Sequence, residues 1–508
     1  MPAPPGVSGF GFSMGAVGDV DGDGVPDLAA TAFDCLLKVY SGASWAELYA
    51  VPICTAPSYG QRYDPQGLGD VDGDGHGDLL IGDPVAFGLI GRVLVLSGAD
   101  GSILHAVSDN SELYGWSVLA LGDGDGARDF ASSQPGLSNP AFGIASVDVW
   151  SGRTGQLLWH THAQTYDEEL EALGSGGDVD GLDDLALRRR WTNPASGSPI
   201  TQRFEVWSVA HGPLFVLELP RVSGFAPVGD VDGDGAPDFA LSDFDQFPVV
   251  GMHGVSVVRI VSFARGVIAS SERMPVRVST LEPIADLNCD GIVELISGDR
   301  WANEERGELY LLSGVTGALL NRYDFGPGTR GLGDQVGAFG DLDGDGTTEL
   351  LDRVYLASGD MRVVVLRTST MRPLARYCVT TPNSVGSVAR LRSLGLLSVF
   401  DQRLALGVDG VPPGAAALFV RGVEPAALPF GDGVLCLSPF AGGLARVDVA
   451  VADGAGSAWT ERMFEAPGAS NAAILAGSSW SFQCLYRDAQ GGPAGFNTSD
   501  ALRGTFLP

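Results

Sequence analysis

Lysine is nearly absent from this 508-residue chain, as are apolar stripes at helical spacing and long apolar runs. A membrane-spanning helix needs at least about 18 apolar residues in a row, so we expect no membrane insertion. The shortage of basic residues leaves a formal net charge of -31, with 62 acidic against 31 basic residues. Nucleic acids and anionic membranes are bound through basic patches, so this balance argues against both as partners.

Cysteine is also sparse, with six residues in the chain. Cys35 and Cys54 flank a predicted turn symmetrically, which would place them opposite each other in a β-hairpin. Cys436 and Cys484 stand apart near the C-terminus and form a second candidate pair. We expect these two disulfides, and with them an oxidising compartment, over the alternative of six buried thiols. The pairing of the other two cysteines is not predicted.

Glycine and proline, in contrast, are abundant, at 72 and 30 residues. Both residues disfavour long helices, and both are used in tight turns. The composition therefore predicts an all-β fold with many turns. With 45% hydrophobic residues, the chain also has the apolar side chains that a folded core requires.

An Asp- and Gly-rich segment recurs along the chain and is its most informative feature. It first occurs as DVDGDGVPD at residues 19–27. The other complete copies span residues 70–78, 230–238, 286–294 and 341–349. Two further copies are incomplete: LGDGDGARD at 121–129 lacks the first Asp, and DVDGLDD at 178–184 is two residues short. Successive copies begin 51 to 57 residues apart.

A second repeat follows each Asp-rich loop. It consists of an alternating strand, a Ser-Gly or Thr-Gly turn and another strand, as in VLVLSGADGSILHAV at 93–107 and LYLLSGVTGALLNRY at 309–323. Each unit is thus predicted to hold four strands: one before the loop, one after it, and the hairpin pair. Seven such units predict a seven-bladed β-propeller over residues 8–402. Residues 403–508 contain short alternating segments without an Asp-rich loop, and predict a small C-terminal β-sandwich-like domain.

The loop has the composition of a calcium site, because Ca²⁺ takes six to eight oxygen ligands from a sharply folded segment. Positions one, three, five and nine offer side-chain oxygens, position seven offers a backbone carbonyl, and glycine at positions four and six permits the tight wrap. The predicted ligands of the five complete loops are Asp19, Asp21, Asp23, Val25 and Asp27; Asp70, Asp72, Asp74, His76 and Asp78; Asp230, Asp232, Asp234, Ala236 and Asp238; Asp286, Asn288, Asp290, Ile292 and Glu294; and Asp341, Asp343, Asp345, Thr347 and Glu349. We expect weak binding or none in the incomplete loops, at Asp123, Asp125, Asp129, Asp178, Asp180 and Asp184.

Two other assignments of the loop are disfavoured. An EF-hand needs a bidentate Glu at position twelve and an exiting helix. Position twelve here is Ala30, Ile81, Leu241, Ser297 or Asp352, and the residues around it are strand-like. Mg²⁺ demands a stricter octahedron and keeps its waters. We therefore expect about five Ca²⁺ ions as the cofactors, one in each complete loop.

With these motifs in view, the sequence resembles the FG-GAP repeat family, whose best-known members are the integrin α-subunit propellers. The resemblance rests on FGFSMGAVGDVDGDGVPDLAATA at 10–32 and YGWSVLALGDGDGARDFASSQP at 114–135. It covers roughly residues 8 to 380, although several units lack the Phe-Gly pair. The resemblance implies a calcium-binding propeller with a role in adhesion. The C-terminal stretch resembles domains appended to secreted bacterial repeat proteins.

No catalytic constellation is evident in the sequence, and we expect no enzyme. The six histidines lack metalloprotease or zinc-finger spacing, and Ser13 in GFSMG matches a nucleophile elbow by pattern alone. His160 and His162 alternate on one predicted strand face and could chelate a metal, although a solvated strand end is the simpler interpretation.

The expected function is that of a secreted or cell-surface, non-catalytic scaffold for adhesion or protein interaction. Its partner would be an extracellular protein or glycan, the chain would be monomeric, and a signal peptide would have been removed from its N-terminus. A carbohydrate-binding propeller is the alternative, and a hydrolase-associated propeller is a third possibility that would need a separate catalytic domain. The alternative rests on tryptophans that could stack on sugars or simply pack between strands: Trp45, Trp116, Trp150, Trp159, Trp191, Trp207 and Trp301.

Overall fold

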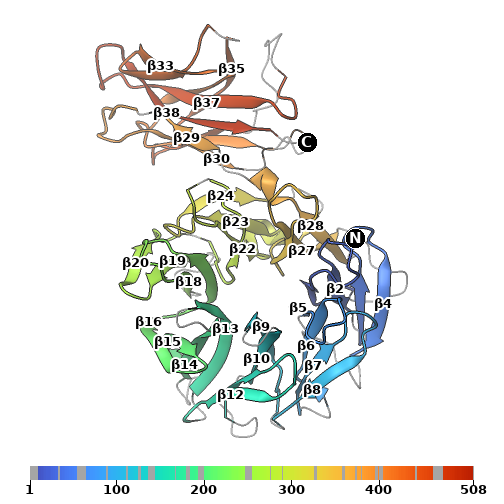
Figure 1. Ribbon diagram of the computed structural model, residues 1–508. Coiled ribbons are helices and arrows are strands. Elements are labelled where there is room, and N and C mark those ends of the chain that lie inside the picture. The colour runs from blue at the N-terminus through green and yellow to red at the C-terminus, as the bar shows by residue number, and fades with distance from the viewer. Residues whose placement is uncertain are drawn as a thin grey trace. The chain divides into compact units, whose positions relative to one another are not determined.

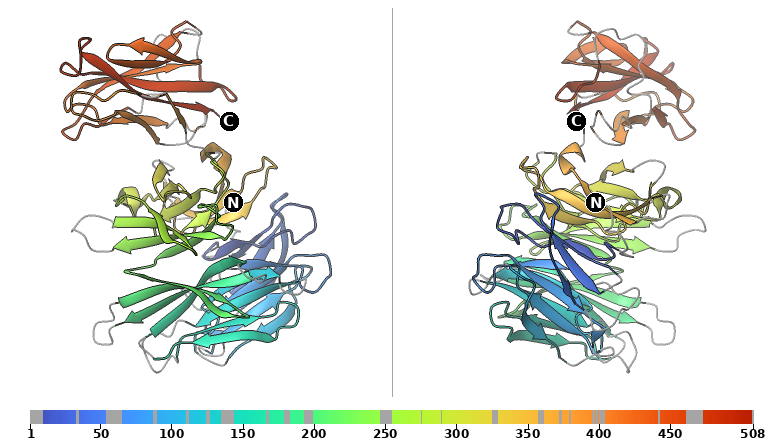
Figure 2. Two further views of the ribbon diagram at one scale, coloured as in Figure 1. Left: turned by 60° about the vertical axis from the view of Figure 1, so that its left-hand side comes forward. Right: turned by 90° about the vertical axis from the view of Figure 1, so that its right-hand side faces the viewer.

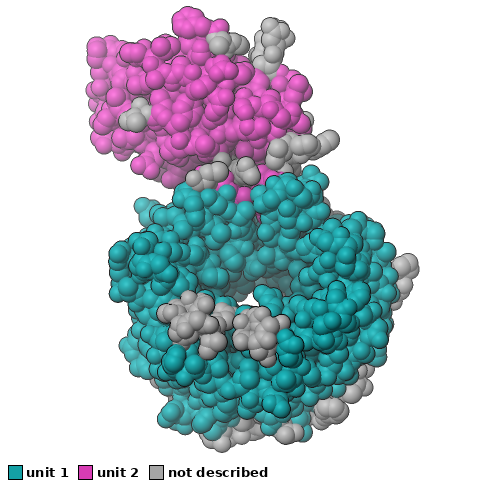
Figure 3. Space-filling view, in the orientation of Figure 1, with its two compact units in different colours: residues 1–286, 290–319, 324–367 teal, residues 287–289, 320–323, 368–508 magenta. Residues whose placement is uncertain are grey.

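The computed structural model divides the chain into two compact units. Unit 1 comprises residues 1–286, 290–319 and 324–367, and unit 2 comprises residues 287–289, 320–323 and 368–508 (Figure 3). The structure describes residues 10–32, 35–53, 65–86, 90–109, 112–123, 127–134, 144–165, 168–178, 183–192, 199–245, 255–274, 276–288, 290–324, 329–356, 361–371, 374–378, 380–394, 397, 399, 404–440, 443–460 and 473–506.

The Asp-loop repeats fold into seven successive antiparallel sheets, which we call blades one to seven. Blades one to six each contain four strands in chain order, as predicted, and the blades follow one another around a ring with a central opening (Figures 1 and 3). Within a blade the first strand lies beside the opening and the fourth on the rim, as β13 (Glu168–Asp178) and β16 (Gly212–Leu219) show (Figure 1). This is the blade arrangement of a β-propeller.

The strands of blades one to three are β1 (Met14–Ala16), β2 (Leu28–Thr31), β3 (Leu36–Tyr40), β4 (Glu47–Pro52), β5 (Gln66–Gly69), β6 (Asp78–Asp83), β7 (Arg92–Leu96), β8 (Ile103–Val107), β9 (Ser117–Asp123), β10 (Arg128–Gln134), β11 (Ser146–Trp150) and β12 (Leu157–His162). Blades four to six add β14 (Asp183–Thr192), β15 (Pro199–Ser208), β17 (Gly224–Gly229), β18 (Asp238–Asp245), β19 (Val255–Ser262), β20 (Gly266–Ser270), β21 (Glu282–Pro283), β22 (Leu295–Asp299), β23 (Glu308–Leu312) and β24 (Leu319–Tyr323). A short helix, α2 (Ala302–Glu305), lies between β22 and β23.

The blades are held together by apolar side chains that fill the space between neighbours. Ala29 and Leu37 of blade one and Leu79 and Leu94 of blade two belong to one buried cluster, and similar clusters join later blades. The second strand β6 is buried along its whole length, whereas the rim strand β12 is mostly exposed. A single twisted sheet could not bury both of its faces, so the stacking of blades is what gives each repeat a core (Figure 2).

Blades one and seven meet where the ring closes, and no strand is exchanged between them among the described residues. Phe10 and Met14 share a buried cluster with Phe339 and Val363. The Arg353 guanidinium donates hydrogen bonds across the seam to the carbonyls of Gly11 at 3.2 Å and Phe12 at 2.7 Å. Among the described residues, apolar packing and the buried Arg353 guanidinium thus link the first and last blades.

Blade seven differs from the prediction. It contains β26 (Gly337–Gly340), β27 (Glu349–Leu356) and β28 (Met361–Leu366), with β25 (Thr329–Arg330) paired to β27. The segment predicted as its fourth strand instead forms a short 3₁₀ helix, η2 (Thr368–Met371), and then β29 (Ala375–Tyr377), which pairs with the last strand of unit 2. Residues 368–402, predicted as the end of the propeller domain, therefore lie in unit 2.

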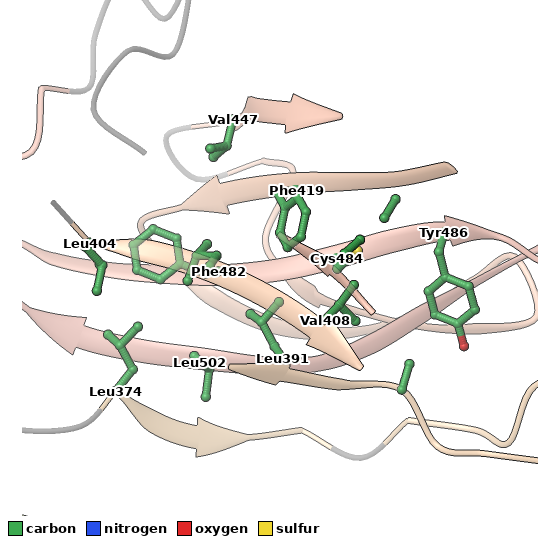
Figure 4. Close-up of a cluster of buried hydrophobic side chains, with 14 of the residues drawn as sticks. Leu374, Leu391, Leu404, Val408, Phe419, Val447, Phe482, Cys484, Tyr486 and Leu502 are labelled. Atoms are coloured by element: carbon green, nitrogen blue, oxygen red, sulfur yellow. The ribbon is translucent and has the colours of Figure 1, made fainter. Parts of the chain in front are cut away.

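The described residues of unit 2 form three sheets, five-, three- and two-stranded, with strand orders β29-β38-β37-β32-β35, β30-β31-β36 and β33-β34. Their further strands are β30 (Arg390–Leu394), β31 (Ala405–Asp409), β32 (Ala416–Gly422), β33 (Pro425–Phe430), β34 (Gly433–Leu437), β35 (Leu444–Val451), β36 (Ala458–Thr460), β37 (Ser479–Arg487) and β38 (Phe496–Thr505). The two larger sheets share one apolar core, in which Leu391 and Val408 meet Phe419 and Phe482 (Figure 4).

The cysteines correct one of the two predicted disulfides. Cys436 is bonded to Cys378, and Cys484 is a free thiol, so the predicted pair of Cys436 with Cys484 is wrong. Cys484 lies in the core between the larger sheets (Figure 4), whereas Cys436 belongs to a separate cluster that contains Cys378. Cys35 is disulfide-bonded, but its predicted partner Cys54 lies outside the described residues.

In the part of the chain that the structure describes, no helix has the length and apolarity to span a membrane.

Candidate metal centres

Each complete Asp-rich loop is organised by its first carboxylate. In loop one, Asp19 Oδ1 accepts hydrogen bonds from the amides of Gly22 at 2.8 Å and Asp23 at 3.0 Å, and Oδ2 accepts from Gly24 at 2.9 Å. Gly22 and Gly24 have φ of 78° and 88°, a conformation that favours glycine. The chain therefore wraps around the Asp19 carboxylate, which turns the other polar side chains of the loop toward one another.

The same wrapping recurs in all five complete loops. Asp70, Asp230, Asp286 and Asp341 each accept amide hydrogen bonds from their own loops. In every loop three acidic side chains can place one oxygen each within 4.8 Å of the others. The trios are Asp19, Asp21 and Asp27; Asp70, Asp72 and Asp78; Asp230, Asp232 and Asp234; Asp286, Asp290 and Glu294; and Asp341, Asp343 and Glu349.

The remaining predicted ligands lie in the loops but outside these trios. They are the carboxylates of Asp23, Asp74, Asp238 and Asp345 and the side chain of Asn288. At position seven, the amides of Val25, His76, Ala236, Ile292 and Thr347 donate to the position-five carboxylate at 2.8 to 3.1 Å. This turn shapes the loop around the position whose carbonyl was predicted as a ligand.

The closing carboxylate at position nine ties the loop to the hairpin of its own blade. Asp78 Oδ2 accepts from the Val71 amide at 2.8 Å, and Oδ1 accepts from the amide of Gly98 in the β7–β8 turn at 2.9 Å. A Cβ atom on Gly98 would lie 2.0 Å from the Gly77 carbonyl oxygen, so only glycine allows this approach. Gly42 makes the same contact with Asp27 at 2.8 Å. The recurring Ser-Gly turn in the sequence is thus part of the metal-loop structure.

Two of the blades with complete loops lack glycine at this turn. The position of Gly42 and Gly98 is occupied by Phe263 in blade five and by Thr368, which follows β28 of blade seven. Among the described residues, Asp238 Oδ1 and Glu349 Oε1 are buried and accept no hydrogen bond. Such carboxylate oxygens are costly to bury unless a donor or a cation meets them.

Electrostatics also favours a cation in these loops. Burial raises the pKa of Asp27, Asp78, Asp238 and Glu349, and other carboxylates of the same loop raise it further. A divalent ion would favour the ionised form of every one of these groups. The donors are oxygens, as hard cations such as Ca²⁺ prefer, and the wrapped loop is of the kind that Ca²⁺ uses. The residues of the five complete loops therefore fit calcium.

The two incomplete loops prove to be alike. The length of each loop can be measured from the strand pairing around it. In blade one, Ala16 of the first strand pairs with Leu28, the residue directly after the closing acid Asp27. In blade three the equivalent pair is Ala120 with Phe130, and in blade four it is Ser175 with Leu185. Both connections are two residues shorter than in blade one, since 28 − 16 = 12 and 130 − 120 = 185 − 175 = 10.

Loop three has thus lost two residues, as loop four has, rather than only its first Asp. Of the six acids predicted to bind weakly there, Asp125 and Asp180 lie outside the described residues. Asp123 and Asp178 end the strands β9 and β13. Asp129 retains the closing contact, since its Oδ1 accepts from the Gly152 amide at 3.3 Å. Asp184 is fully buried.

Other sequence candidates fall outside the loops. Ser13 is fully buried within blade one. Trp45, Trp116 and Trp301 are exposed by 37%, 48% and 42%. Trp150, Trp159 and Trp207 pack against apolar clusters between blades, and Trp191 lies under the Arg203 guanidinium at 4.9 Å. Three of the seven tryptophans are thus partly exposed, although the Arg300 guanidinium lies over the Trp301 ring at 4.4 Å and Trp45 stacks on Phe339.

Comparison with known proteins supports a distant relationship to an integrin α subunit. The chain is 28% identical over 206 residues to integrin alpha-PS2 of Drosophila melanogaster, in a match that covers 35% of this chain and 15% of that protein. The chain thus spans only a small part of that relative's length. No protein-family model matches the chain. Its structure is similar to those of U3-55K and of the RRP9 WD40 repeats, each with a TM-score of 0.44 and 12% identity, over 72% of this chain and 97% and 96% of theirs.

Proposed function

We propose that the protein is a calcium-binding, seven-bladed propeller of the FG-GAP type that serves outside the cell as a non-catalytic scaffold for adhesion or protein interaction. The observation that carries the proposal is the set of five wrapped acidic loops, one in each of five blades, together with the distant similarity to an integrin α subunit. We also propose the secreted bacterial type, and a β-sandwich-like packing for unit 2.

Calcium in this proposal acts as a brace between blades. The Gly77 amide of loop two donates to the Asp19 carbonyl of loop one at 3.1 Å, and the His76 ring nitrogen Nδ1 bonds to the Val20 carbonyl at 2.7 Å. Across the ring closure, Pro26 of loop one packs on Gly340 beside loop seven. An ion that rigidifies one loop would therefore also stabilise the backbone carbonyls to which the next loop bonds.

The partner would be an extracellular protein, held on a scaffold that is rigid only when its loops are filled. The Cys378–Cys436 disulfide is compatible with an oxidising compartment. A glycan is the second candidate, favoured by the exposed Trp116 and Trp301. Catalysis is not part of either proposal.

Thermal melting with and without a chelator tests the structural half of the proposal. Ligands that bind only the native state raise stability by RT ln(1 + [L]/Kd), about 2.7 kcal/mol for each site at a hundredfold excess over Kd. We expect a large fall in melting temperature on chelation. An unchanged melting temperature would contradict the brace.

Arrays of extracellular proteins and of glycans, probed with the calcium-loaded chain, test the binding half. The scaffold proposal expects a protein ligand whose binding disappears with chelator, and silence on the glycan array. Selective glycan binding that is lost in Trp116→Ala or Trp301→Ala would favour the second candidate instead.

A further inference from the structure

A second kind of polar cluster lies on blade three, away from the Asp-rich loops. His160 and His162 occupy alternate positions on the rim strand β12, so that both side chains leave the same face of the sheet. Their rings are stacked, with centroids 5.5 Å apart and planes 28° from parallel. Both residues are exposed to solvent.

His160 does not behave as a simple solvated side chain. It lies opposite Asp148 of β11, and its Nδ1 bonds to Asp148 Oδ1. Asp148 is only 1% exposed, so this carboxylate is committed to the bond and is not available to solvent. Because Nδ1 is held by this carboxylate, Nε2 is the ring nitrogen that remains for a metal ion.

A chain of hydrogen bonds holds Asp148 in place. The Tyr114 hydroxyl donates to Asp148 Oδ2 at 2.9 Å, and the Trp150 indole nitrogen donates to the Tyr114 oxygen at 2.7 Å. Tyr114 is fully buried, and burial beside this carboxylate keeps its hydroxyl protonated by raising its pKa. The hydrogen bonds thus run from Trp150 through Tyr114 to Asp148, and fix the carboxylate that orients His160.

A buried carboxylate that fixes one ring nitrogen of an exposed histidine is the usual second shell of a histidine that binds a metal through the other nitrogen. The neighbouring, stacked His162 supplies a second imidazole from the same strand face. We propose that His160 and His162 together bind a divalent transition-metal ion such as Zn²⁺ or Cu²⁺, with Asp148 as a positioning residue. Water or a partner's side chain would complete the coordination.

This site differs in chemistry from the calcium loops. Imidazole nitrogen suits Zn²⁺, Cu²⁺ and Ni²⁺, whereas carboxylate and carbonyl oxygens suit Ca²⁺. An excess of Ca²⁺ should therefore fill the loops and leave the histidine pair open. That difference allows the two kinds of site to be measured separately in the whole protein.

The test is a Cu²⁺ titration of the full chain in excess Ca²⁺, followed by electron paramagnetic resonance and by calorimetry with Zn²⁺. We expect one tight site with splitting from two nitrogens. His162→Ala should lose the second nitrogen and bind at least about tenfold more weakly, and Asp148→Asn should weaken binding by about ten- to a hundredfold while keeping both nitrogens. His162 is exposed, so its variant should keep the melting temperature of the parent.

Two matched variants serve as controls. His105→Ala removes a histidine from β8 of the neighbouring blade, and His76→Ala removes the histidine of loop two; neither should change the tight site. Oxygen-only coordination, or Zn²⁺ affinity that His162→Ala leaves unchanged, would overturn the proposal. Loss of the tight site in His76→Ala would also overturn it, because the metal would then belong to loop two.

Discussion

Blades two and four form the same four-stranded sheet but differ in their Asp-rich loops. Blade two carries a complete loop whose closing acid, Asp78, links the loop to the β7–β8 turn. Blade four has a loop two residues shorter, and toward the end of the sheet away from that loop it holds a buried ion network in which the Arg189 guanidinium bonds to Glu168 and Glu205. The comparison shows that a blade of this ring keeps its four-stranded sheet when its Asp-rich loop is two residues shorter.

The largest expected loss of stability comes from breaking the buried ion network of blade four. Arg189→Ala would leave Glu168 and Glu205 buried at 2% and 4% exposure without their cation. Removal of one partner from a buried ion pair costs about 3–5 kcal/mol. We expect that loss in urea unfolding, equally with Ca²⁺ and with chelator. A loss that appears only in Ca²⁺ would mean that blade four binds metal after all.

Removal of the closing acid compares a complete loop with a shortened one. Asp78→Asn should remove one bound Ca²⁺ and about 3 kcal/mol of calcium-dependent stability, as expected for one site at a hundredfold excess over Kd. The matched Asp129→Asn in blade three should leave the calcium content unchanged. The measurement is the difference in unfolding free energy between Ca²⁺ and chelator for each variant. Equal calcium-dependent losses would erase the distinction between the two loops.

A smaller effect is expected from a side chain on the first strand of a blade, which bonds to the next blade without taking part in metal binding. On β5, the Gln66 amide bridges to β9: Nε2 donates to the Val118 carbonyl at 2.9 Å, and Oε1 accepts from Ala120 at 3.0 Å. Glu282 holds the equivalent position on β21 and accepts from the Ala338 amide at 3.1 Å. Burial raises the pKa of Glu282 to about 7.

This shift has a defined sign. The folded chain keeps the Glu282 proton up to about pH 7, while the unfolded chain loses it near the ordinary value of 4.5, so stability should fall as pH rises between these values. Glu282→Gln removes that loss and should stabilise the protein at pH 8 by about 2 kcal/mol, a figure reduced because Glu282 is partly exposed. Gln66→Glu should introduce the same pH dependence in blade two. Parallel pH profiles for Glu282→Gln and the parent, in excess Ca²⁺, would contradict this account.

The sequence predicted local features well. The Asp-rich loops, the four-strand repeat and the hairpin turns each depend on residues a few positions apart, and the structure has them where the motifs stand. The two-residue deletion in loop three was misjudged because DGDG at 123–126 can be aligned in two ways. Only the pairing of Ala120 with Phe130 decides between them.

Long-range features were the ones that sequence could not supply. Cys378 follows the seventh hairpin motif, and nothing local indicates that β29 leaves the ring to pair with β38 and brings this cysteine to Cys436. Arg353 likewise looks like an ordinary strand residue, although it donates to Phe12 more than 300 residues away. Such contacts depend on the closed ring, and a repeat pattern describes only one blade at a time.

The most direct test of the account is a count of bound metal. The full chain, equilibrated with Ca²⁺ and freed of excess ion by gel filtration, should carry about five Ca²⁺ per molecule, one for each acidic trio. The count should fall to about four in Asp78→Asn. A chain that retains no Ca²⁺ would contradict the central claim, and a count of seven would show that the shortened loops of blades three and four bind metal as well.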